Sequence, residues 1–193
     1  MSKMLICGVA NPDFMPGDNC SRGLFHRCSI SNFIVRWNAP PPGVVKLNFD
    51  GSLSHKPAAG GFIIGDWIGK LIKARAAHYG ESKILIGETR ALRDGIKAAA
   101  NLGINRFLIE GDNATVIRTL RGEVLTQWEI AAIIKDVKKF LSNMTFVSIS
   151  HVYREANMAA DWISKAGQTV FNTEVCWDIS PPQELRDIMD GFL

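Results

Sequence analysis

Four acidic residues occupy positions where a carboxylate could serve in catalysis or metal binding. Glu88 lies on the small, apolar stripe of a predicted helix, where burial requires a cation, hydrogen bonds or a raised pKa. Asp50 and Asp112 stand at the carboxyl ends of two apolar strands, where sites form in α/β sheets. Asp161 lies off the apolar stripe of its helix. Taken singly, each acid has an ordinary structural explanation. Glu88 could form a salt bridge, Asp50 could be a turn residue, and Asp112 could be the N-cap of a helix.

Together, the four acids indicate a metal site built from separate elements. Converging carboxylates repel one another, and hard divalent cations relieve that repulsion. Two Mg²⁺ ions suit in-line attack of water on a phosphodiester, because one activates the water and the other stabilises the leaving oxygen. The sequence contains no P-loop, G-x-S-x-G elbow, H-E-x-x-H or G-x-G-x-x-G motif that would indicate a different chemistry.

Hydrophobic periodicity predicts the elements that must position these acids, in the order β-β-β-α-β-α-α-β-α. The strands are predicted over residues 44–50, 60–67, 70–79, 106–111 and 144–151. The helices are predicted over residues 83–102, 113–120, 127–141 and 156–166. The first strand alternates apolar and polar side chains, which predicts a half-buried strand. We therefore expect an α/β protein with one five-stranded mixed sheet flanked by helices.

Length and composition indicate one globular domain with an extension at each end. The 193 residues are 47% hydrophobic and 21% charged, which excludes disordered and fibrous classes. No apolar run reaches the roughly 18 residues of a membrane-spanning helix, so no membrane association is expected. The proline run of Ala39–Gly43 predicts a rigid linker. We predict a poorly structured extension over 1–36, a domain over 37–167 that folds alone, and an acidic tail over 168–193.

Charge and cysteine content bound the partners and the compartment. The net charge of +3 permits a nucleic-acid partner without demonstrating one. The four cysteines form no C-x-x-C pair, so free thiols, no disulfide and an intracellular location in nucleus or cytoplasm are expected. Two alternatives stay open for the N-terminal extension. One is a metal site from Cys20, His26 and Cys28, and the other is an organelle transit peptide over 19–36.

Four separate segments carry a family pattern. They are WNAPPPGVVKLNFDGS (37–52), GETRALRDGIKAA (87–99), FLIEGDN (107–113) and HVYREANMAAD (151–161). In this order they resemble ribonuclease H of type 1, in its plant-type branch related to retroelement domains. The resemblance covers about residues 37–167 and implies a ribonuclease H-like fold. It also implies Mg²⁺-dependent hydrolysis of the RNA strand of RNA–DNA hybrids with two ions, Mn²⁺ being an alternative metal.

The resemblance also implies roles for individual residues. The metal-binding and catalytic carboxylates would be Asp50, Glu88, Asp112 and Asp161. An auxiliary group that assists product departure or metal exchange would be either His151 or Arg154. Nucleic-acid contacts are implied at Ser52, Lys56 and Asn113. A monomer is expected.

Two departures from the family's bacterial members bear on substrate recognition. Lys56-Pro57 stands in place of an Asn-Pro pair, and Ile84-Leu85 in place of asparagines that read the minor groove of a hybrid. A lysine can reach a phosphate as a point charge, or it can simply be a solvated loop residue. Two function classes therefore follow: a hybrid-cleaving endonuclease that leaves 3′-hydroxyl and 5′-phosphate ends, and a nucleic-acid-binding or interaction module without useful turnover. Asp50-Gly51-Ser52, with no Asp-x-Glu pair, disfavours an exonuclease of the same superfamily.

Overall fold

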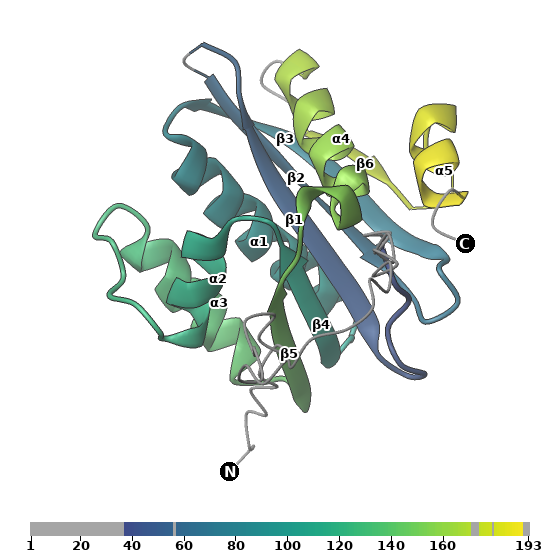
Figure 1. The fold of residues 1–193 in the computed structure, drawn as a ribbon, viewed down its shortest axis with the longest axis horizontal. Helices are drawn as coiled ribbons and strands as arrows, with labels where there is room; N and C mark the ends of the chain where they lie inside the picture. Colours follow the sequence, from purple (N-terminus) through teal and green to yellow (C-terminus); the bar gives the residue numbers. More distant parts are fainter. Residues whose placement is uncertain (1–36, 56, 171–173, 179, 191–193) are drawn as a thin grey trace, which may run out of the picture.

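Six strands form one mixed sheet in the order β5-β4-β1-β2-β3-β6 (Figure 1). The computed structural model describes residues 37–55, 57–170, 174–178 and 180–190. The pairs β1–β2, β2–β3 and β3–β6 are antiparallel, whereas β4 pairs in parallel with β1, and β5 in parallel with β4. The strands are β1 (Val45–Leu53), β2 (Pro57–Gly65), β3 (Leu71–Glu81), β4 (Arg106–Gly111), β5 (Phe146–His151) and β6 (Glu174–Trp177).

Helices cover both faces of this sheet (Figure 1). One face carries α1 (Ile84–Asn101), α2 (Ala114–Arg121) and α3 (Ala131–Leu141). The other face carries α4 (Met158–Ala166), on which α5 (Gln183–Asp190) packs. Short 3₁₀ turns, η1 (Arg154–Ala156) and η2 (Gly167–Thr169), flank α4. Among the described residues, none of the helices combines the length and apolar character needed to cross a membrane.

Helix α1 packs against β1 and β2 through its small and apolar stripe, as the periodicity predicted. Ala91, Leu92 and Ala99 are fully buried in the larger of two hydrophobic clusters. A Cβ atom on Gly95 would lie 2.6 Å from Leu47 Cδ1, so only glycine lets the helix approach the strand this closely. Glu88 lies on the same buried stripe, so its side chain is held between the helix and the sheet.

Strand β1 is buried on both faces, so the expectation of a half-buried strand was wrong. Leu47 and Phe49 enter the larger hydrophobic cluster, as predicted. Lys46, Asn48 and Asp50 are also buried, because α4 crosses β1 and β2 on the opposite face. The polar side chains of β1 are therefore partnered inside the protein instead of facing water.

The chain before β1 turns instead of extending as the proline run predicted. Val44 N donates a hydrogen bond to the Pro41 carbonyl at 3.0 Å, and Gly43 has φ +74°, a left-handed conformation that favours glycine. The 1–36 extension, including Cys20, His26 and Cys28, lies outside the described residues. Cys176, within the described part, is an exposed free thiol.

The C-terminal segment does not behave as the predicted acidic tail. Strand β6 pairs with β3 and makes the sheet six-stranded instead of five-stranded. Leu185 of α5 is fully buried in the second hydrophobic cluster, and Trp162 lies 6.1 Å from Trp177 between ring centroids. The high acid content of 168–193 obscured a four-residue strand and one short amphipathic helix. The sheet thus continues past residue 167, where the sequence placed the domain boundary.

Candidate active site

Three of the predicted carboxylates converge at one end of the sheet. Asp50 of β1 is 6% exposed and Glu88 of α1 is 7% exposed, while Asp112 directly follows β4. Burial raises the pKa of Asp50 to about 7, and the nearby charges of Asp112 and Asp161 add to the effect. Burial likewise raises the pKa of Glu88 to about 8, with Asp50 and Asp112 contributing. The structure therefore places three acids close enough to oppose one another's ionisation.

Gly51 allows α1 to bring Glu88 against β1. A Cβ atom at Gly51 would lie 2.5 Å from Glu88 Cγ and 2.8 Å from the Glu88 backbone nitrogen. Since the backbone of α1 cannot move aside cheaply, glycine next to Asp50 is a steric requirement of this arrangement. Glu88 Oε2 also accepts a hydrogen bond from Asn113 Nδ2 across the site.

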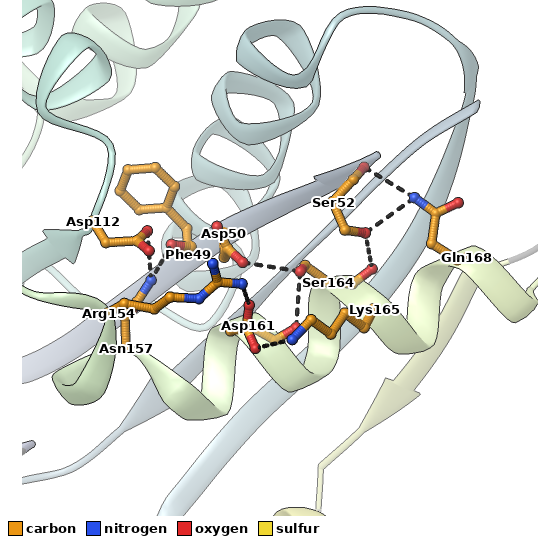
Figure 2. A network of polar contacts seen from close by, with 10 residues as sticks. All are labelled: Phe49, Asp50, Ser52, Asp112, Arg154, Asn157, Asp161, Ser164, Lys165 and Gln168. Carbon is orange, nitrogen blue, oxygen red and sulfur yellow. Dashed lines mark hydrogen bonds and ion pairs between the residues drawn. The ribbon is translucent and has the colours of Figure 1, made fainter. Parts of the chain in front are cut away.

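Asn113, and not Asp112, caps helix α2. Asn113 Oδ1 accepts hydrogen bonds from the backbone nitrogens of Thr115, at 2.9 Å, and Val116, at 3.3 Å. The N-cap that the sequence suggested as an explanation for Asp112 is therefore Asn113. Asp112 Oδ1 instead accepts a hydrogen bond from Asn157 Nδ2 at 3.1 Å (Figure 2).

Asp161 joins the group from α4 and is held by two cations. Arg154 of η1 and Lys165, one turn along α4, form ion pairs with its two carboxylate oxygens (Figure 2). Although partial burial opposes ionisation, the hydrogen bonds from Lys165 and Arg154 lower the pKa of Asp161 below its usual value. Ser164 Oγ, on the same helix face, lies 3.0 Å from Asp50 Oδ2 and donates to it. Helix α4 thus contacts the carboxylates through several side chains.

Of the remaining predicted site residues, His151 and Ser52 belong to the described part of the chain. His151 is exposed at the end of β5, with Nε2 3.0 Å from the Asp112 carbonyl. The Ser52 hydroxyl donates a hydrogen bond to the Ser164 carbonyl at 2.7 Å and accepts one from Gln168 Nε2 at 3.1 Å. Both contacts lie within the fold. Lys56 lies outside the described residues.

The donor set fits a hard divalent cation. All four acids offer carboxylate oxygens, the ligands that Mg²⁺ and Mn²⁺ accept, and the mutual repulsion at Asp50 and Glu88 is the kind that a cation relieves. In the described part of the chain, no three acidic, imidazole or thiol side chains already stand together as a ligand set. Two of the acids are instead engaged with other side chains: Asp161 with Arg154 and Lys165, and Glu88 with Asn113.

Sequence reasoning missed three side chains that hold the carboxylates: Asn157, Ser164 and Lys165. A signal for them was present. Asn157 and Ser164 stand four residues before and three residues after Asp161, a spacing that puts all three on one helix face. Lys165 stands four residues after Asp161, the spacing of an ion pair within a helix.

Comparison with known proteins identifies the family. A family model described as reverse transcriptase-like matches residues 48–167, from within β1 to the first residue of η2. The chain belongs to the reverse transcriptase-like family. It is also similar to an Arabidopsis thaliana protein named "Putative ribonuclease H protein", with 26% identity over 133 residues, which make up 68% of this chain and 22% of the relative. The chain thus spans about a fifth of the length of that relative.

Solved structures agree with this assignment. Ribonuclease H1 of the halophilic archaeon Halobacterium salinarum is 25% identical with a TM-score of 0.62, covering 65% of this chain and 98% of that one. The N-terminal ribonuclease H domain of a Mycobacterium tuberculosis protein is 18% identical with a TM-score of 0.63, covering 65% and 94%. LC11-RNase H1, solved with an RNA/DNA hybrid, is 18% identical with a TM-score of 0.57, covering 62% and 92%. The resemblance to ribonuclease H and the ribonuclease H-like fold are confirmed.

Proposed function

We propose that the protein is a metal-dependent endoribonuclease that hydrolyses the RNA strand of RNA–DNA hybrids. The observation that carries the proposal is the convergence of Asp50, Glu88 and Asp112. Asp50 and Glu88 are buried and have raised pKa values, and Asp112 contributes to both shifts. Maintaining such a group without a cation is unfavourable, and perturbed acids of this kind are typical of functional sites. The similarity to ribonucleases H, one of them solved with a hybrid, supplies the substrate class.

In this proposal, the acidic residues and Ser164 have separate roles. Asp50, Glu88, Asp112 and Asp161 would hold two Mg²⁺ ions, with Mn²⁺ as a substitute. When bound, these ions supply water activation and neutralise charge on the leaving oxygen. Ser164 fixes the orientation of Asp50 by its hydrogen bond.

Arg154 and His151 are the two candidates for the auxiliary group. Arg154 is two-thirds exposed and forms an ion pair with Asp161, and its planar guanidinium is suited to binding a phosphate in the same region. His151 is exposed and keeps Nε2 near the Asp112 carbonyl, with its ring edge-on to that of Tyr153. For hybrid contacts, we propose Lys56 as a phosphate contact, with Asn113 and Ser52 at the edge of the site.

A cleavage assay tests the proposal. Labelled RNA–DNA hybrid, duplex RNA and duplex DNA are incubated with the full chain and Mg²⁺, with and without a chelator. We expect cleavage of the RNA strand of the hybrid alone, abolished by the chelator and by Glu88→Gln. Asp136→Asn is the matched control, because Asp136 is an exposed acid on α3. Equal cleavage by Glu88→Gln and the wild type would contradict the proposal.

A second candidate function is a nucleic-acid-binding module that lacks turnover. Ile84 and Leu85 at the start of α1 favour it, because apolar side chains there cannot hydrogen-bond the minor groove of a hybrid. This candidate predicts hybrid binding that survives Glu88→Gln and no cleavage by the wild-type chain. The same assay, with a binding measurement beside it, separates the two functions.

A further inference from the structure

A chain of hydrogen bonds runs along the buried polar face of β1 from Trp37 to Asp112. Trp37 Nε1 donates to Asn48 Oδ1 at 3.0 Å, and Asn48 Nδ2 donates to Asn157 Oδ1 at 3.1 Å. Asn157 Nδ2 donates in turn to Asp112 Oδ1 at 3.1 Å and to the Phe49 carbonyl at 3.0 Å. Asn48 and Asn157 are both almost completely buried. The carboxylate is thus linked to a residue that precedes the first strand.

The chemistry of the two ends fixes the direction of this chain. The indole of Trp37 can only donate, and an ionised Asp112 can only accept. Each amide between them therefore has one satisfactory orientation. Turning the Asn157 amide over would place its oxygen against the Asp112 carboxylate and the Phe49 carbonyl. Turning the Asn48 amide over would set its NH₂ group against the indole N–H.

A buried ion pair secures the remaining donor of Asn48. Glu110 Oε2 lies 3.4 Å from Asn48 Nδ2 and 2.9 Å from Lys46 Nζ. Lys46 in turn donates to the Asn38 carbonyl and lies 4.8 Å from the centroid of the Trp37 ring. Since an unpaired buried polar group is strongly unfavourable, these contacts hold Asn48 in a single position.

We infer that Asn48 is a positioning residue: it fixes the amide of Asn157, which orients the Asp112 carboxylate. The catalytic consequence rests on the proposed function, whereas the structural consequence rests on the hydrogen bonds alone. Trp37 and Lys46 precede residues 48–167, the part matched by the family model. The support of the site therefore begins upstream of the family segment, in the stretch that turns into β1.

Carbon-13 NMR of the side-chain carboxyl of Asp112, in the full chain without metal and at constant pH, tests the structural part. Asn48→Ala removes the middle of the chain of hydrogen bonds, and Trp37→Phe removes the indole donor while keeping an aromatic ring. Both variants are expected to shift the Asp112 resonance. Trp128→Phe is the matched control, because Trp128 is 84% exposed, and it should leave the resonance in place. An Asp112 resonance unchanged in Asn48→Ala would overturn the inference, whether or not the protein cleaves hybrids.

Calorimetric titration with Mn²⁺ tests the catalytic part with four proteins: wild type, Asn48→Ala, Asn157→Ala and the double variant. Loss of a residue that orients a metal ligand weakens metal binding by roughly tenfold or more. Because Asn48 acts through Asn157, the double variant should bind Mn²⁺ as weakly as Asn157→Ala alone. Losses of Mn²⁺ affinity that multiply in the double variant would show independent roles and overturn the inference.

Two further outcomes have separate meanings. Asn48→Ala with a lower melting temperature and unchanged Mn²⁺ affinity would show that Asn48 contributes to stability only and would overturn the catalytic part. A wild-type chain without Mn²⁺ binding would refute the proposed function and leave the NMR result to decide the positioning.

Discussion

The acids of the site differ in what surrounds each carboxylate. Asp161 has two cationic partners and a lowered pKa, whereas Asp50 and Glu88 are buried among other acids and have raised pKa values. At neutral pH and without metal, the pair Asp50 and Glu88 therefore retains protons that exposed carboxyl groups would have lost. A cation that enters the site must displace those protons, so metal binding and proton release are coupled.

Asp50→Asn should abolish hybrid cleavage while preserving or raising the melting temperature of the metal-free protein. The substitution removes a charge that opposes ionisation of Glu88, and the amide oxygen can still accept the hydrogen bond from Ser164. Cleavage and thermal melting in a chelator at pH 8 check both parts. A melting temperature far below that of the wild type would show that the ionised carboxylate is needed for folding.

The stability of the metal-free protein should fall as pH rises from about 4 to about 8. In the unfolded chain Asp50 and Glu88 titrate near 3.8 and 4.5, whereas in the folded chain they titrate near 7 and 8. The folded state binds more protons across this interval, so each step up in pH favours unfolding. Urea denaturation at pH 5, 6.5 and 8 in a chelator measures the trend.

The double variant Asp50→Asn with Glu88→Gln serves as the comparison for that trend. It should show a much flatter dependence on pH, because the two groups responsible for it no longer titrate. Mg²⁺ added to the wild type at pH 8 should recover stability, since it binds the folded state. A free energy of unfolding that rises from pH 5 to pH 8 in the wild type would contradict the assignment.

At the scale of elements, periodicity predicted most of the fold and only part of the site. The 106–111 strand and the burial of Glu88 followed directly from the pattern of apolar residues. Burial of Lys46 and Asn48 could not be predicted in this way. Alternation of apolar and polar residues indicates that one face of the strand is exposed to solvent, and it cannot reveal that a helix from later in the chain covers that face. Strand β6 was missed because four residues with two exposed positions give too weak a pattern.

The contact between β1 and α1 makes a prediction about Gly51. Gly51→Ala should reduce hybrid cleavage strongly, because the new Cβ would collide with the Glu88 side chain and backbone. Relief requires α1 to move away from β1, and overpacking of this kind costs about 1–3 kcal/mol of stability. Gly103→Ala is the control: its added Cβ meets open space, although its φ of +72° introduces backbone strain. Cleavage and urea denaturation should show that Gly103→Ala loses stability only, whereas Gly51→Ala loses both stability and activity. Full activity in Gly51→Ala would show that the helix tolerates the displacement.

Across the whole molecule, segments from both ends of the described chain pack on the α4 side of the sheet. Trp37 approaches Asn48 from before β1, and α5 packs on α4 from beyond the family segment. Met189 of α5 and Trp37 line one small pocket together with Ala159 of α4. Since α4 carries Asp161 and Ser164, the end segments support the helix that contacts the carboxylates. The expectation that residues 37–167 suffice for a stable domain stays a prediction, and the packing of α5 argues against it.

Leu185→Ala tests that packing without removing any part of the chain. Leu185 is fully buried in a hydrophobic cluster that includes Ile63 and Ile163, so its truncation should lower the free energy of unfolding by about 2–4 kcal/mol. Leu125→Ala is the matched control, because Leu125 is 95% exposed and its loss should change stability by less than about 0.5 kcal/mol. Hybrid cleavage well below the melting temperature should be retained in both variants, since neither residue contacts the acids. Equal stability of the two variants would show that the packing of α5 on α4 contributes nothing to stability.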